Sequence, residues 1–269
     1  MPKTVAHRGC SLSYQVRGSG DPVVLIQGVG LHGDGWLPQT TALSTRYRCL
    51  TFDNRGMAAS QPVAVPLTVE QMAEDTLAIM DDASIDSAHI VGHSLGGLVA
   101  LQMALAARDR VRSLALLCTS ARGADATRFA PEIVWPGMRS RIGTRRMRRR
   151  AFLEIIMPPA ALAGQDPDAL AETLAPYFGH DLADSPPIVN QQLNALKRYN
   201  ATPRLAALQG VPALVLSAAH DVIFPPRFGR ALAGGIPGAT YREVSDAAHG
   251  VTIQFPGLVN EALLHHWRE

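Results

Sequence analysis

Short apolar runs alternate along most of the chain with longer segments of helical periodicity. Apolar runs of about four to eight residues, bounded by turn residues, are typical of buried strands. The predicted strands are Ser11–Arg17, Val23–Ile26, Arg48–Phe52, Ala88–Val91, Val111–Cys118, Pro212–Ser217 and Thr240–Val244, and the clearest helices are Val69–Asp82, Leu98–Ala107 and Pro256–Trp267. Strands that alternate with helices predict an α/β protein with a mostly parallel sheet.

The alternation stops between Ser120 and Thr202. This stretch is rich in arginine, proline and helical patterns, and no strand is predicted within it. A chain of this length accommodates one α/β domain that carries an insertion. We therefore predict an α/β core made of residues 1–120 and 203–269, with residues 121–202 inserted as a helical cap.

The composition indicates a globular domain with a large core. Of the 269 residues, 47% are hydrophobic and 18% are charged, and the formal net charge is only +2. This balance argues against disorder and against nucleic acid as a partner. Cys10, Cys49 and Cys118 are odd in number and lack C-x-x-C spacing. We therefore expect no disulfide framework, no metal site and no cofactor.

The sequence carries no recognisable export or membrane signal. The first twenty residues are polar, and no stretch of about 18 apolar residues occurs. We expect a cytoplasmic protein without a membrane span, whose partner is a small-molecule substrate. The oligomeric state has no signature in the sequence.

The segment Gly92-His93-Ser94-Leu95-Gly96 matches G-x-S-x-G. In a strand-to-helix turn, this pattern places a serine in a strained conformation with its hydroxyl exposed above the sheet. A predicted strand ends directly before the motif and a predicted helix follows it, as the pattern requires. We therefore predict that Ser94 is a nucleophile. His93 cannot easily reach the neighbouring hydroxyl, so we interpret it as a packing residue.

A nucleophilic serine needs a histidine base and an acid that orients the base. On this kind of fold the order along the chain is Ser, Asp or Glu, then His. His249 follows the last predicted strand and Asp221 follows the strand before it, so we predict that they are the base and the acid. Asp246 is the competing acid, and His265 and His266 are expected on a solvated helix face.

The loop of residues 27–36 contains four glycines directly after an early predicted strand. Such a loop can turn backbone amides toward the negative oxygen of a tetrahedral intermediate. We predict that the amide of Val29 is one oxyanion donor and that the amide of Leu95, directly after the nucleophile, is the other.

These motifs, in this order, resemble the α/β-hydrolase superfamily over nearly the whole chain. The resemblance rests on Gln27-Gly28 with Trp36, Asp53-Asn54-Arg55-Gly56 running to Ser60, the G-x-S-x-G motif, His220-Asp221 and Ala248-His249-Gly250. It implies an eight-stranded sheet and is strongest to bacterial esterases, enol-lactone hydrolases and cofactor-free haloperoxidases or perhydrolases. Many relatives carry His-Gly where this chain has Gln27-Gly28. Relatives that use an aspartate nucleophile, the haloalkane dehalogenases and epoxide hydrolases, are disfavoured by Ser94.

The predicted function is hydrolysis of an ester, thioester or lactone bond in a medium-sized, largely apolar molecule through an acyl-enzyme. The same triad could instead serve C–C bond hydrolysis, acyl transfer or perhydrolysis. A protein of another class, a small-molecule receptor with slow residual turnover, is the further alternative.

The predicted cap supplies candidate walls for the substrate pocket and one strongly basic run. The candidate lining residues are Trp135, Met138, Phe152, Ile155, Ile156, Met157, Tyr177 and Phe178. In the basic run of residues 139–150, the helical spacing predicts that Met138, Ile142 and Phe152 face inward and the arginines face solvent. An anionic substrate or an acidic surface is the alternative use of these arginines.

Overall fold

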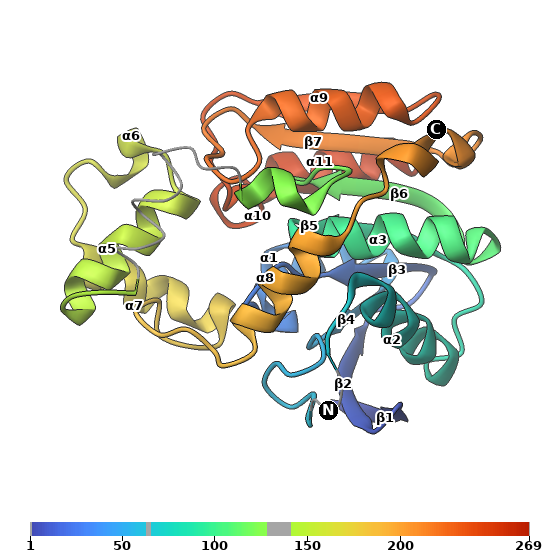
Figure 1. Cartoon of the computed structure of the whole chain (residues 1–269), viewed down its shortest axis with the longest axis horizontal. Helices are drawn as coiled ribbons and strands as arrows, with labels where there is room; N and C mark the ends of the chain where they lie inside the picture. The colour runs from blue at the N-terminus through green and yellow to red at the C-terminus, as the bar shows by residue number, and fades with distance from the viewer. Residues whose placement is uncertain (1, 63–65, 128–140, 269) are drawn as a thin grey trace.

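A central sheet of eight strands organises the molecule (Figure 1). The computed structural model of the chain describes residues 2–62, 66–127 and 141–268. The strands are β1 (Lys3–His7), β2 (Cys10–Arg17), β3 (Asp21–Ile26), β4 (Tyr47–Phe52), β5 (Ala88–His93), β6 (Val111–Leu117), β7 (Ala213–Ala218) and β8 (Thr240–Val244). Their spatial order is β1-β2-β4-β3-β5-β6-β7-β8, and all pairs after β2-β4 are parallel. The predicted mostly parallel eight-stranded sheet is confirmed.

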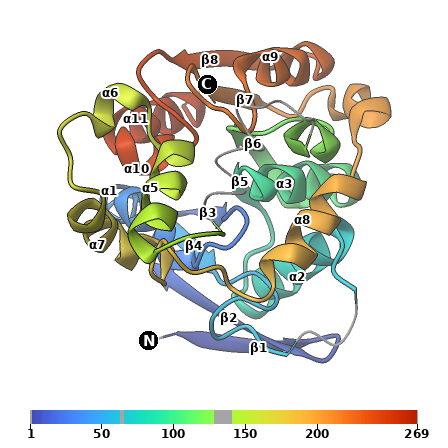
Figure 2. The same ribbon diagram turned by 60° about the vertical axis from the view of Figure 1, so that its left-hand side comes forward.

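Helices cover both faces of the sheet because its central strands are apolar on both sides. In β3, Val24 and Ile26 point to the face covered by α2 (Val69–Asp82), α3 (Leu95–Ala106) and α9 (Pro226–Gly235). Val23 and Leu25 point to the opposite face, covered by α1 (Leu37–Leu43), α10 (Val251–Gln254) and α11 (Pro256–His266). The turned view in Figure 2 shows α2 and α3 on one side of the sheet and α1, α10 and α11 on the other.

The sequence pattern missed β1 and misjudged one end of α11. β1 is an edge strand without a fully buried residue, so it has no apolar run to reveal it. His265 is exposed as expected, but the prediction that His266 is solvated was wrong, because His266 is buried with Val259 and Leu263 on the inner face of α11. Residues spaced by three or four lie on one face of a helix, and this spacing carries His266 inward.

Four α-helices lie between β6 and β7 within the described residues: α5 (Arg145–Ile156), α6 (Pro159–Leu162), α7 (Pro167–Phe178) and α8 (Val189–Arg198). Figure 1 shows α5, α6 and α7 grouped beyond the sheet, while α8 runs back beside α3. Leu153 and Ile156 of α5 pack with Leu174 and Phe178 of α7 in a small separate apolar cluster. We call the described residues 141–202 the cap segment. The boundaries of a cap at 121 and 202 stay a prediction.

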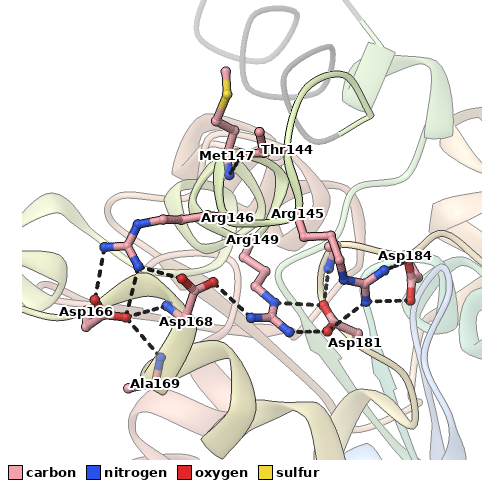
Figure 3. A network of polar contacts seen from close by, with 11 residues as sticks. Thr144, Arg145, Arg146, Met147, Arg149, Asp166, Asp168, Ala169, Asp181 and Asp184 are labelled. Atoms are coloured by element: carbon pink, nitrogen blue, oxygen red, sulfur yellow. Dashed lines mark hydrogen bonds and ion pairs between the residues drawn. The ribbon is translucent and has the colours of Figure 1, made fainter.

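Three arginines of α5, Arg145, Arg146 and Arg149, pair with aspartates of the cap segment (Figure 3). Arg146 contacts Asp166 and Asp168, and Arg149 contacts Asp168 and Asp181. Arg146 and the backbone amides at the start of α7 lower the pKa of Asp166 to about 2. These ion pairs hold α5 against the first residues of α7 and against the loop that follows α7.

One detail of the predicted α5 pattern was wrong. The side chain of Ile142 is 66% exposed rather than turned inward. It lies in the turn before Thr144, which caps α5 by accepting a hydrogen bond from the Met147 amide, so helical spacing does not apply to it. Phe152 is partly buried against the cap cluster as predicted. Met138 lies outside the described residues.

A buried ion pair joins the N-terminal hairpin to the core. The Arg55 side chain is fully buried, and its Nε and Nη2 donate to the carboxylate of Asp75 at 2.8 and 2.6 Å. Its Nη2 also donates to the carbonyl of His7 at 3.0 Å, and the His7 ring nitrogen Nδ1 lies 2.8 Å from Asp75. The guanidinium thereby connects the loop after β4, helix α2 and strand β1.

Replacing Asp75 with asparagine should destabilise the fold by about 3–5 kcal/mol, because it leaves a buried guanidinium without its counter-charge. Chemical denaturation monitored by circular dichroism measures this difference. Asp81 on the same helix provides the matched control, since it is 65% exposed and pairs with Arg110 at the surface. Asp81→Asn should cost under about 1 kcal/mol. Equal losses in the two variants would contradict the role assigned to the buried pair.

Candidate active site

Ser94 occupies a strained turn between β5 and α3. Its φ and ψ are 56° and −119°, a conformation that non-glycine residues rarely adopt. The turn is possible because its neighbours lack side chains: a Cβ on Gly92 would lie 2.2 Å from the carbonyl oxygen of Gly96, and one on Gly96 would lie 2.1 Å from that of Ile26. The sequence motif therefore has the strand–turn–helix context that a nucleophile elbow requires.

His249 and Asp221 lie together although 28 residues separate them in the chain. Nδ1 of His249 is 2.8 Å from Oδ2 of Asp221, and both side chains are almost completely buried. The other carboxylate oxygen of Asp221 accepts the backbone amides of Ile223 and Phe224 at 2.8 and 2.9 Å. Since a carboxylate accepts, Nδ1 carries the proton, and the neutral ring keeps Nε2 as a free acceptor.

The surroundings of Asp221 hold it in its charged form. Burial works against the charge, but the nearby His249 and the two backbone amides outweigh it, so the pKa of Asp221 lies below its ordinary value. Asp246 has no comparable position. It is exposed, and the hydroxyl of Ser245 donates to it at 2.9 Å. The geometry therefore favours Asp221 over Asp246 as the partner of His249.

His93 supports the loop that carries His249. Its Nε2 donates to the backbone carbonyl of His249 at 2.8 Å, and the two ring centroids are 4.9 Å apart. Burial lowers the pKa of His93 to about 3, so its ring is neutral at ordinary pH. This packing position agrees with the interpretation of His93 as a residue that does not act on the serine proton.

Cys118 is a neighbour of Asp221 that the sequence did not reveal. It is buried at the end of β6 with a φ of 46°, and its thiol interacts with the Asp221 carboxylate. The potential ligand atoms of His93, Cys118 and His249 lie within 4.8 Å of one another, which makes them a possible metal-binding group among the described residues. Each already interacts with a neighbouring group: Cys118 and His249 with Asp221, and His93 with the His249 carbonyl.

The glycine-rich loop passes directly beside Ser94. A Cβ on Gly28 would lie 3.0 Å from the Cβ of Ser94. The amides of Gly28 and Gly30 have partners, since they donate to Oε1 of Gln27 at 3.3 Å and to Oε1 of Gln192 at 2.8 Å. Within the described part of the chain, the Val29 amide between them has no hydrogen-bond acceptor. The amide of Leu95, the first residue of α3, has no acceptor within its helix.

Two other segments hold this loop in place. From the loop after β4, the side-chain amide of Asn54 donates to the carbonyl of Gln27 at 3.0 Å, and Asp53 accepts the amide of Gly33 at 3.0 Å. From the cap segment, Nε2 of His180 lies 3.0 Å from the carbonyl oxygen of Gly30. Gly30 is therefore held from both sides, with its amide bound to Gln192 and its carbonyl to His180.

A cavity of about 580 Å³ lies over this arrangement. Ser94, His249 and Val29 line it together with residues of the cap segment. Of the predicted wall residues, Phe152, Ile155, Ile156 and Phe178 line this cavity. Met157 lines a separate cavity of about 550 Å³, and Tyr177 lines neither of these two. Trp135 and Met138 lie outside the described residues.

The fold and this arrangement define a class of protein: an α/β protein with a serine at a strained strand-to-helix turn, close to a hydrogen-bonded histidine–aspartate pair. The family model for the α/β-hydrolase fold matches residues 21–256. The chain belongs to the α/β-hydrolase family, and the resemblance inferred from its motifs is confirmed.

Relatives with different printed activities share this fold over their whole length. RutD of Azorhizobium caulinodans, provisionally named a carbamate hydrolase, is 32% identical over 267 residues, 96% of each chain. The crystal structure of an enol-lactonase from Burkholderia xenovorans superposes with a TM-score of 0.82 at 29% identity, over 99% of this chain and all of that one. A thermophilic esterase from Thermogutta terrifontis superposes with a TM-score of 0.81 at 25% identity, over 100% of this chain and 98% of that one. Hydrolysis is the activity that these names share.

No helix in the described ranges has the length and apolar character needed to span a membrane.

Proposed function

We propose that this protein is a serine hydrolase that cleaves carboxylic ester, thioester or lactone bonds through an acyl-enzyme. The observation that carries the proposal is the hydrogen bond between Asp221 and His249 beside the strained Ser94 turn. A buried pair of this kind fixes the imidazole tautomer that can take a proton from a serine hydroxyl. The enol-lactonase and esterase among the relatives are consistent with such substrates.

In the proposed acylation step, Oγ of Ser94 attacks the substrate carbonyl carbon while its proton passes to Nε2 of His249. The carbonyl oxygen becomes an oxyanion, and the amides of Val29 and Leu95 donate hydrogen bonds to it. When the intermediate collapses, the bond to the leaving alcohol or thiol breaks, and His249 returns the proton to it. The acyl group then remains as an ester on Ser94.

Water completes the proposed cycle. His249 accepts a proton from the water, whose oxygen attacks the acyl carbon, and the second tetrahedral intermediate releases the carboxylic acid and the Ser94 hydroxyl. Throughout, Asp221 orients the imidazole and stabilises its charged form, because its own pKa is held low. A lactone follows the same path, except that the leaving hydroxyl stays attached to the product.

The cavity favours a substrate with a substantial apolar part. Its walls include Val29, Phe152, Ile155, Phe178 and Leu196, and Ser94 and His249 line the same cavity. Cavities of several hundred Å³ with mostly apolar walls and few polar groups are typical small-molecule sites.

A graded set of ester chain lengths and lactones, assayed with the purified protein, tests this proposal. Alcohols and hydrogen peroxide added as competing acceptors separate hydrolysis from acyl transfer and perhydrolysis. The proposal predicts that carboxylic acids are the main products in water and that turnover depends on Ser94. Release of acid without dependence on Ser94, or the absence of turnover across the set, would contradict it.

Gln192 should affect the rate through the proposed oxyanion loop. Its Oε1 accepts the Gly30 amide, next to the Val29 amide. Gln192→Leu removes that acceptor and lets the loop shift, and small displacements of a catalytic group cost up to about a hundredfold in rate. We expect kcat for a chromogenic ester to fall roughly tenfold or more, with little change in KM, in steady-state assays.

Gln191 is the matched control for this prediction. It is the preceding residue of α8 and is exposed, so Gln191→Leu should leave kcat nearly unchanged. If Gln192→Leu raised KM and left kcat unchanged, Gln192 would act on substrate binding instead of on the loop.

A further inference from the structure

Two cations that have no acidic partner among the described residues lie in the wall of the cavity over Ser94. The formally charged lining residues among those described, apart from the histidines, are Arg141, Asp184 and Lys197. Asp184 is paired, because its carboxylate accepts from the guanidinium of Arg145 at 3.0 Å. Neither Arg141 nor Lys197 has an ion pair or a side-chain hydrogen bond with any residue that the structure describes.

Four arginines of α5 differ from these two cations because they have acidic partners, although Arg148 and Arg198 also lack an ion pair among the described residues. Arg145, Arg146, Arg149 and Arg150 each pair with an aspartate or glutamate, and the first three form the network in Figure 3. Acidic residues are therefore abundant around α5, yet none neutralises the two cations that reach the cavity. An anionic group of a bound molecule would find both of them available.

The position of Lys197 gives a rough length for such a molecule. Val189 at the start of α8 lies beside the glycine loop, since a Cβ on Gly30 would be 3.2 Å from its Cγ2. Lys197 follows eight residues later in the same helix, about 12 Å along its axis at 1.5 Å per residue. Val189, Leu193 and Leu196 line the cavity between these ends, so the face that α8 contributes to the cavity before Lys197 is apolar.

From this arrangement we propose that the cavity selects substrates whose acyl part ends in a carboxylate, bound by Arg141 and Lys197 away from the scissile bond. The apolar walls contact the chain between the two functional groups. A guanidinium and an ammonium suit a carboxylate, which accepts hydrogen bonds through two oxygens. This inference rests on the proposed ester hydrolysis and names its substrate class: half-esters of medium-length dicarboxylic acids.

Two matched chromogenic esters test the inference. One is the mono-4-nitrophenyl ester of suberic acid, and the other is the same ester with the distant carboxylate replaced by the neutral amide. We expect kcat/KM to favour the carboxylate by roughly tenfold, because two partly exposed charge contacts contribute modestly. The preference should shrink between about 0.01 M and about 1 M salt, where the screening length falls from about 30 to 3 Å. The corresponding two esters of succinic acid are too short to reach Lys197, so kcat/KM should differ little between them.

Substitutions of the two cations test whether they cause the preference for the carboxylate ester. Arg141→Gln and Lys197→Gln should each reduce it, and the double variant should bring the ratio close to one without altering kcat/KM for the neutral amide ester. Arg198→Gln is the matched control, since Arg198 is the exposed neighbour on α8 and does not line the cavity. Thermal melting of each variant verifies that it is folded.

The outcomes separate this inference from the proposed function. If both suberic esters are hydrolysed at equal rates through Ser94, or if the double variant keeps the preference, the carboxylate site is wrong and the hydrolase proposal stands. If neither ester is hydrolysed by the wild-type protein, the proposed function fails and the carboxylate site fails with it.

Discussion

Ser94→Ala should lower kcat for ester hydrolysis by about 10⁴-fold or more, because the variant cannot form an acyl-enzyme. Among the described lining residues, the other hydroxyl side chains are those of Ser185 and Thr252, and neither lies at the strained turn before α3. Residual activity would come from substrate binding and the oxyanion amides alone, which still exceed the rate in water. Spectrophotometric release of 4-nitrophenol measures the loss, and mass spectrometry of a rapidly quenched reaction detects the acyl group on Ser94.

Ser185→Ala is the control for this change, since Ser185 also lines the cavity but lies on an exposed loop of the cap segment. It should keep most of the wild-type kcat. Ester turnover that survives in Ser94→Ala would show that the acyl-enzyme mechanism is wrong. A variant that loses turnover but still carries acyl label after quenching would place the nucleophile elsewhere.

Most parts of the fold that the sequence predicted have strong burial patterns; β8 is the exception, because its bounds were predicted although none of its residues is fully buried. The runs at β3, β5, β6 and β7 are buried almost throughout, and α2 has the bounds that its periodicity indicated. β1 was missed because an edge strand leaves most of its side chains in water. His266 was misplaced because polarity alone does not report which face of a helix meets the core.

In the candidate site, too, some residues could be predicted from the sequence and others could not. Ser94, Asp221 and His249 were predicted because each follows a strand, and parallel strands bring their carboxyl ends to one edge of the sheet. The groups that hold them were not found. Gln192 binds a glycine 162 residues away, and Cys118 approaches Asp221 from another strand. Such contacts depend on tertiary packing, and no local spacing marks them.

The basic run in the cap segment shows how local charge can mislead. From the sequence, the run suggested a solvated helix face, with an anionic substrate or an acidic surface as the alternatives. In the structure Arg145, Arg146 and Arg149 pair with aspartates that lie 19 to 39 residues further along the chain, such as Arg149 with Asp168 and Asp181. The charge available to a ligand is therefore smaller than the composition of the run implies, and Arg141, one of its arginines without an ion pair among the described residues, lines the cavity.

Asp221→Asn should lower kcat by about 10⁴-fold while the protein stays folded, because the amide favours the wrong tautomer of His249. Oδ2 of Asp221 accepts from Nδ1, and its Oδ1 accepts the amides of Ile223 and Phe224. An asparagine keeps its carbonyl oxygen on those amides and turns its NH₂ toward His249. Nδ1 then becomes the acceptor, so the proton moves to Nε2, where it blocks removal of the serine proton.

Asp246→Asn separates this explanation from a general effect of lost negative charge near His249. Asp246 is three residues from the base but exposed and in contact with Ser245, so its variant should retain kcat within about twofold. The pH profile adds an independent reading. Because the pKa of Asp221 lies below its ordinary value of about 4, its carboxylate stays charged as the pH falls to that value, and its effect is lost only at lower pH. The loss in Asp221→Asn should therefore persist from neutral pH down to about pH 5. Comparable losses in the two variants would make Asp246 part of the acid function and would break the proposed pairing of Asp221 with His249.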